Sequence, residues 1–200
     1  VAGIAEAGAG SAAGASAGAA AVLEEAAHPG AGDTMNVRRM FRHLITPPWA
    51  VRCAMPAAAV QEVEAAVQAG EAAHRGELRV AVEGALDPGP LFRGQTARER
   101  ALEVFAQLRG WDTEENCGVL IYVLLADRQV EIVADRGMHA RIGPETWSAI
   151  CADMETDFRQ RAFKAGLLKG LTAIHTLLAR EFPATGRNPN ELPDRPALLR

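Results

Sequence analysis

Three side chains that carry oxygen ligands stand at the ends of apolar segments: Glu83, Asn116 and Asp135. We expect segment 77–83 to form a strand parallel to 130–134, with an antiparallel strand, 119–125, beginning at the edge where these two end. The three side chains would then converge at the edge of the sheet where open α/β folds bind ligands. Two carboxylates and an amide oxygen suit Ca²⁺ or Mg²⁺, because both ions prefer oxygen ligands.

The same residues allow other chemistry. The carboxylate pair would serve acid/base catalysis if its neighbours separated the two pKa values, and Arg136 and His139 would bind a phosphate or carboxylate. Each residue also has a plain structural explanation. Asn116 would cap a turn, Asp135 and Arg136 would form a surface ion pair worth roughly 0–1 kcal/mol, and Glu83 would be a solvated strand end. No spaced catalytic motif decides between these readings, so the catalytic residues stay unknown.

A β-hairpin is the element that must position these side chains. Segments 119–125 and 130–134 are rich in β-branched and large apolar residues and flank a polar break at 127–129, which is typical of two strands joined by a tight turn. The first segment is apolar at nearly every position, so both of its faces should be buried.

Helices are predicted around these strands. Thr96 and Glu99 form a capping box that opens a helix through Leu108, and a buried stripe runs from Phe163 to Leu178 at helical spacing. The order of helices and strands predicts an α/β fold, a three-layer α/β/α sandwich with a small mixed central sheet.

Residues 35–55 are expected to form a basic helical arm. Arg38, Arg39 and Arg42 stand among apolar residues with no acidic residue between 35 and 52, and the proline pair at 47–48 should end the helix. One interpretation is an arm that contacts anionic lipid or an acidic protein partner. The other is a helix packed on the domain with its arginines in solvent.

One folded domain, 56–183, is expected between two flexible ends. Residues 1–34 are Ala or Gly at 21 of 34 positions, too little side-chain volume for a core, so we expect disorder. A secretory signal fits poorly, because no basic segment precedes the apolar part and Glu6 interrupts it. Met35 opens the segment of ordinary composition, and we expect the native start near it. Residues 184–200 should be an extended tail.

Composition narrows the classes of function. The net charge of -4 and pI near 5.8 give no general attraction to nucleic acid, so no nucleic-acid partner is expected. No apolar run approaches the roughly 20 residues that span a bilayer. Three cysteines without a CxxC motif suit a reducing compartment. We therefore expect a cytoplasmic protein, with any membrane contact peripheral to the inner membrane.

Several short segments, taken in order, resemble a known family. They are GELR at 76–79, Trp111, NCGVL at 116–120, VEIV at 130–133 and AGLLKG at 165–170. In this order and spacing they resemble the TPM domain over about 56–183. Two positions depart from the family pattern. Segment 53–56 lacks the acid that members often carry there, and 134–137 reads Ala-Asp-Arg-Gly where many members have Gly-Tyr-Gly.

The resemblance implies a small α/β domain and two possible roles. We expect a binding or assembly module linked to membrane proteins or envelope maintenance, with an unknown protein partner. Acid phosphatase activity and calcium binding have been proposed for parts of the family. The alternative is therefore a divalent-metal-assisted acid phosphatase that acts at the C-terminal edge of the sheet, with Ca²⁺ or Mg²⁺ as the candidate cofactor.

Overall fold

The computed structural model describes residues 37–113, 116–139, 141–185 and 190–199. Its helices are α1 (Val37–Ile45), α2 (Ala50–Ala54), α3 (Ala57–Glu71), α4 (Pro88–Phe92), α5 (Ala97–Gln107), α6 (Arg136–His139), α7 (Pro144–Arg159) and α8 (Phe163–Glu181). Its strands are β1 (Glu77–Glu83), β2 (Gly118–Leu124), β3 (Gln129–Ala134) and β4 (Ala197–Leu199). The predictions made for residues 1–34 and for a start near Met35 lie outside these ranges.

The four strands form one mixed sheet in the order β3-β2-β1-β4. β1 runs parallel to β2, from the pair Glu77–Gly118 to the pair Glu83–Leu124. The β2–β3 hairpin is antiparallel. β2 is buried at every position, as expected for a strand with packed layers on both sides.

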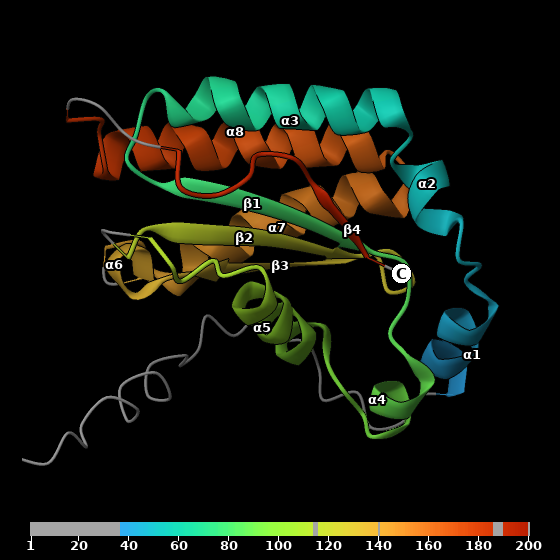
Figure 1. Ribbon diagram of the computed structural model, residues 1–200. Helices are drawn as coiled ribbons and strands as arrows, with labels where there is room; N and C mark the ends of the chain where they lie inside the picture. Colours follow the sequence, from blue (N-terminus) through green and yellow to red (C-terminus); the bar gives the residue numbers. More distant parts are fainter. Residues whose placement is uncertain (1–36, 114–115, 140, 186–189, 200) are drawn as a thin grey trace, which may run out of the picture.

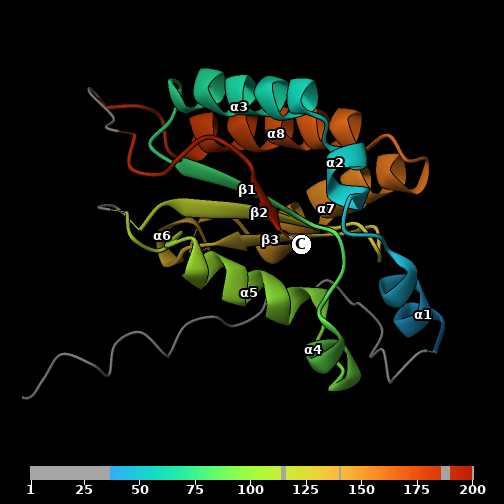
Figure 2. The same cartoon turned by 45° about the vertical axis from the view of Figure 1, so that its right-hand side comes forward.

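Helices cover both faces of this sheet (Figures 1 and 2). α3, α7 and α8 lie over one face, and α5 lies over the other. Successive side chains of a strand point to opposite faces, so Val119 and Ile121 belong to the core beneath α7 and α8, whereas Leu120 and Tyr122 belong to the core beneath α5. This arrangement confirms the predicted α/β/α sandwich with a small mixed sheet.

Local signals in the sequence also produce their expected structures. The capping box of α5 is formed, because Thr96 Oγ1 accepts the N–H of Glu99 at 3.1 Å and the Glu99 carboxylate accepts the N–H of Thr96 at 2.8 Å. The apolar stripe of α8 is buried from Leu167 to Leu178. These contacts satisfy or bury groups that lie only three or four residues apart, so the sequence predicts them well.

The C-terminal segment adds a fourth strand that its sequence does not predict. β4 pairs in parallel with the second half of β1. The segment before it is held by side chains of β1. Glu77 Oε2 accepts the backbone N–H groups of Glu191 and Leu192 at 3.2 and 3.3 Å, and the Arg79 guanidinium donates to the carbonyl of Pro193. A three-residue strand is too short to show a period in the sequence.

Two histidines, the buried His74 and the half-buried His175, connect the end of α3 to α8. His74 Nε2 and His175 Nδ1 are 2.7 Å apart, and His74 Nδ1 accepts the N–H of Gly76 at 3.2 Å. Because Nδ1 of His74 accepts, its Nε2 carries the proton and donates to His175. Burial, followed by the charge that His175 could carry, lowers the pKa of His74 from 6.5 to about 4.

We expect His74 to make folding sensitive to acid. Its pKa in the folded protein lies below 6.5, so its contribution is complete above pH 6.5 and is lost as the pH falls toward about 4, by about 3 kcal/mol. Burial raises the pKa of Glu71 to about 8 and that of Glu131 to about 7. These two groups act in the opposite direction, because they favour the folded state at low pH.

The effect of His74 is therefore measured as a difference between two proteins. Urea unfolding of the wild type and of His74→Gln, which cannot take up the proton, should be compared near pH 7 and near pH 4.5. The free-energy difference should move in favour of the variant as the pH falls. A difference that is the same at both pH values would show that His74 does not remain neutral.

Candidate functional site

The predicted ligand cluster of Glu83, Asn116 and Asp135 does not assemble. β1 is parallel to β2 and antiparallel to β3, so the prediction that 77–83 and 130–134 are parallel is wrong. Glu83 pairs with Leu124 at the carboxyl end of β2, whereas Asp135 follows the residue that pairs with Val119 at the amino end. Glu83 therefore lies at the opposite end of the sheet from Asn116 and Asp135.

Glu83 is already occupied by partners on the α5 face. The Arg100 guanidinium donates from Nε to Oε2 at 2.9 Å and from Nη2 to Oε1 at 3.0 Å, while the Tyr122 hydroxyl donates to Oε2 at 2.6 Å. Burial, together with the nearby Glu83 charge, raises the pKa of Tyr122. Glu83 therefore acts as a buried counter-ion between the sheet and α5, and not as a free ligand.

Asn116 and Asp135 do lie at the same end of the sheet. The Asn116 carbonyl accepts the N–H of Gly137 at 3.1 Å, and Asp135 N donates to the Gly118 carbonyl at 2.9 Å. Asn116 is exposed and has a left-handed backbone, with φ of 53°, which suits a turn residue. Asp135 is buried. Its Oδ1 accepts the N–H of Arg136 at 2.7 Å, and its Oδ2 has no partner among the described residues.

Of the predicted cluster, the Oδ2 atom of Asp135 is the carboxylate oxygen left without a described partner at this end of the sheet. Among the residues that the structure describes, no group of three or more His, Cys, Asp or Glu could hold a metal ion. Oδ2 of Asp135 could accept from a water or contact a cation, but Ca²⁺ needs six to eight oxygen ligands. Arg136 is exposed on α6, and for His139 only the backbone of that helix is described. Binding of Ca²⁺, Mg²⁺ or an anion here stays a prediction.

A second region of interest lies at the other end of the sheet, where α1 is anchored by its polar side. Arg39 Nε donates to Asp127 Oδ2 at 2.9 Å, and Arg42 Nη2 to Asp127 Oδ1 at 3.2 Å. His43 Nε2 lies 3.0 Å from Oδ2, and His43 Nδ1 accepts the N–H of Leu86. Asp127 stands in the β2–β3 turn. Arg39 is buried against it, unlike in either predicted orientation of the arm, whereas the Arg42 side chain pairs with Asp127 and stays 50% exposed.

These contacts stabilise the ionised form of Asp127. Burial alone would raise its pKa, but hydrogen bonds from His43 and Arg39 and the positive charge of the guanidinium outweigh burial, so the pKa of Asp127 is lowered. An ionised and buried carboxylate of this kind fixes the rotation of α1 about its axis, because only the side that carries Arg39 and His43 can satisfy it.

As a result, α1 turns its apolar side to solvent. Val37, Phe41, Leu44 and Ile45 have the i, i+4, i+7, i+8 spacing of one helix face, and each is more than half exposed. Trp49, at the start of α2, is 63% exposed. We call these five residues the apolar face. Most amphipathic helices of a soluble domain bury this side, so the orientation of α1 is reversed.

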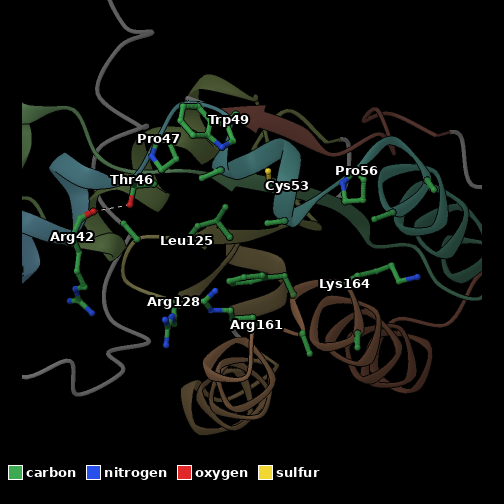
Figure 3. Close-up of a pocket in the computed structure, with 18 of the residues that line it drawn as sticks. Arg42, Thr46, Pro47, Trp49, Cys53, Pro56, Leu125, Arg128, Arg161 and Lys164 are labelled. Carbon is green, nitrogen blue, oxygen red and sulfur yellow. Dashed lines mark hydrogen bonds between the residues drawn. The ribbon is translucent and has the colours of Figure 1, made fainter.

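An open groove runs beside the apolar face, at the end of the sheet where β1 and β2 finish (Figure 3). Its volume is about 1140 Å³. Ile45, Trp49 and Leu125 contribute apolar side chains. Four cationic side chains also line it: Arg42, Arg128, Arg161 and Lys164. The carboxyl ends of parallel strands are where ligands bind in open α/β sheets, so this groove is a better candidate site than the predicted cluster.

Sequence reasoning identified the basic arm but missed the side chains that define this region. The sequence indicates for Asp127 only a place in a turn, and its partner Arg39 is 88 residues away, so no local pattern connects them. The spacing of Val37, Phe41, Leu44 and Ile45 was the signal that could have indicated an apolar helix face. Which way that face points could not be read from the spacing.

Comparisons with known proteins agree with this fold. The model of the TPM domain matches residues 54–177, more than half of the chain, and the chain therefore belongs to the TPM domain family. It is also similar to the BA42 protein from the psychrophilic bacterium Bizionia argentinensis, solved by NMR. The two share 27% sequence identity with a TM-score of 0.64, over 72% of this chain and 94% of BA42. No curated protein matched the chain.

The BA42 likeness covers nearly all of that protein, so what the two chains share is the whole domain and not a fragment of it. Within the described ranges, none of the helices is both long enough and apolar enough to cross a bilayer.

Proposed function

We propose that this TPM-domain protein is a binding module that docks on an anionic membrane surface through the apolar face of α1. The observation that carries the proposal is the reversed orientation of α1: Arg39 and His43 are buried against Asp127, and Phe41 and Ile45 are exposed. Exposing these side chains to water is unfavourable by roughly 25 cal/mol per Å² of apolar surface. A partner that covers them would recover this free energy.

A bilayer interface suits the apolar face for two reasons. The face includes a tryptophan, a residue enriched where protein meets the headgroup region. It is also flanked by positive charge, because no acidic residue occurs between 35 and 61 while Arg38, Arg42 and Arg52 do. Each arginine near an anionic surface contributes about 1 kcal/mol, although the whole chain carries a net charge of -4.

Vesicle binding tests the proposal. The full chain should sediment with vesicles of phosphatidylglycerol and phosphatidylcholine at low salt, and less with phosphatidylcholine alone. Phe41→Ser with Ile45→Ser should lower the partition coefficient about 30- to 150-fold, because two large apolar side chains together contribute roughly 2 to 3 kcal/mol. Neither residue contacts the core, since they are 62% and 58% exposed, so folding should be unchanged by circular dichroism.

Trp111 provides a matched control. It is 55% exposed, comparable with Trp49, but it lies before β2 at the opposite end of the sheet. Vesicles should shift the emission of Trp49 to the blue, and Trp49→Phe should remove the shift whereas Trp111→Phe should not. The proposal fails if the wild type does not sediment at low salt. It also fails if Phe41 and Ile45 instead mediate a concentration-dependent dimer in solution.

The alternative function is a divalent-metal-assisted phosphatase. The observation that favours it is the buried Asp135 Oδ2, which has no partner among the described residues. Glu83 cannot contribute, because it lies at the other end of the sheet and binds Arg100. Metal-dependent hydrolysis of phosphomonoesters that is lost in Asp135→Asn would establish this activity.

A further inference from the structure

The groove beside the apolar face holds two cations without a counter-charge. Arg42 is paired with Asp127 at 3.2 Å and Lys164 with Glu62 at 2.8 Å. Within the described part of the chain, the guanidinium groups of Arg128 and Arg161 form no ion pair or hydrogen bond. Lysine and arginine charges that face a groove without a partner attract anions.

Both of these arginines are held in turns of unusual backbone conformation. Arg128, in the β2–β3 turn, has a φ of 55°, and Arg161, between α7 and α8, has a φ of 63°. The left-handed region normally favours glycine or asparagine. In Figure 3 the two labelled side chains lie on the same stretch of the rim, between the β2–β3 turn and the start of α8, while Lys164 is directed away from them.

The groove also has an apolar wall that continues into the apolar face. Ile45 and Trp49 belong to both, and Leu125 and Phe163 line the groove further in. At about 1140 Å³ the groove exceeds the roughly 300–1,000 Å³ of a typical small-molecule site. It is therefore far larger than an inorganic anion requires, and its composition suits a molecule with an anionic head and an apolar body.

We infer that this groove binds the headgroup of an anionic phospholipid. The phosphate lies at Arg128 and Arg161, whose guanidinium groups can donate to its oxygens in pairs. The glycerol and the first acyl carbons lie along Ile45 and Trp49, toward the apolar face. This inference rests on the membrane docking proposed above and adds to it a choice of lipid, because the apolar face by itself does not distinguish one headgroup from another.

Soluble short-chain lipids test the groove without a membrane. The full chain should bind monomeric dihexanoyl-phosphatidylglycerol saturably, followed by Trp49 emission and by calorimetry. Arg128→Gln with Arg161→Gln should weaken this binding at least about tenfold, since hydrogen bonds to charged groups contribute roughly 1.5–3 kcal/mol. Dihexanoyl-phosphatidylcholine should bind the wild type at least about tenfold more weakly, because its headgroup carries a compensating positive charge.

Arg109→Gln with Arg180→Gln is the control for net charge. Both residues are exposed and lie near the opposite end of the sheet, and their replacement should leave lipid binding unchanged. Inorganic phosphate is the control for a free-anion site and should bind much more weakly than the lipid. The inference is overturned if the Arg128/Arg161 variant binds like the wild type, if the control pair weakens binding equally, or if phosphate alone binds as tightly.

Different results would contradict membrane docking through α1 and lipid binding in the groove. Phe41→Ser with Leu44→Ser removes two residues of the apolar face that do not line the groove and keeps both groove arginines, so it should weaken vesicle binding and retain binding of the soluble lipid. If the wild type binds the soluble lipid but not vesicles, membrane docking is wrong and the groove site stands. If it binds vesicles but not the soluble lipid, the groove inference is wrong and docking through α1 stands.

Discussion

Replacing Glu83 by alanine should lower the free energy of unfolding by about 3 kcal/mol. The carboxylate receives three hydrogen bonds from Arg100, two of them from Nε, and one from the buried Tyr122 hydroxyl. Removing one partner of a buried ion pair leaves the other charge unpaired, which usually costs about 3–5 kcal/mol. The lower figure applies because the Arg100 side chain is 20% exposed and keeps some contact with water.

Glu103 is the internal control for this prediction. It contacts the same guanidinium, with Arg100 Nη1 and Glu103 Oε2 at 3.0 Å, but its side chain is 51% exposed. Glu103→Ala should therefore cost less than about 1 kcal/mol. Urea unfolding of both variants and of the double variant measures the difference. Equal effects of Glu83→Ala and Glu103→Ala would show that burial does not decide the strength of these pairs.

Gly118→Ala should also destabilise the fold by about 3 kcal/mol, at the upper end of what an added methyl group costs in a packed site. Gly118 opens β2 and pairs with Glu77 of β1. A Cβ at this position would lie 1.8 Å from the carbonyl oxygen of Gly110. Because the obstacle is backbone, it cannot turn away as a side chain would, and the end of β2 or the turn at Gly110 must move.

Gly89→Ala is the comparison for Gly118→Ala. A Cβ at Gly89 would meet only the end of the Arg93 side chain, at 3.6 Å, which is ordinary van der Waals contact. We expect a change within about 0.5 kcal/mol. Thermal or urea unfolding of the two variants decides the matter, and a Gly118→Ala protein as stable as the wild type would mean that β2 and the Gly110 turn are not packed as closely as in the structure.

The family and the layers of this protein follow from the sequence. Short-range patterns sufficed for the hairpin, for the Thr96 capping box and for the buried stripe of α8, because each depends on residues a few positions apart. The position of the predicted ligand cluster could not be obtained in this way. Placing Glu83, Asn116 and Asp135 required the relative direction of β1 and β3, and a strand of alternating or continuous apolar residues looks the same in either direction.

The reversed orientation of α1 likewise separates what the sequence determines from what only the tertiary structure determines. The sequence by itself determined that residues 37–45 form a helix with one apolar and one basic side. Only the tertiary structure decided which side faces solvent, through Asp127, which lies 88 residues from Arg39. The physical reason is that a helix can bury either side, and the side it buries depends on which buried charge across the fold must be neutralised. Here a carboxylate draws the basic side inward and leaves Phe41 and Ile45 exposed to solvent.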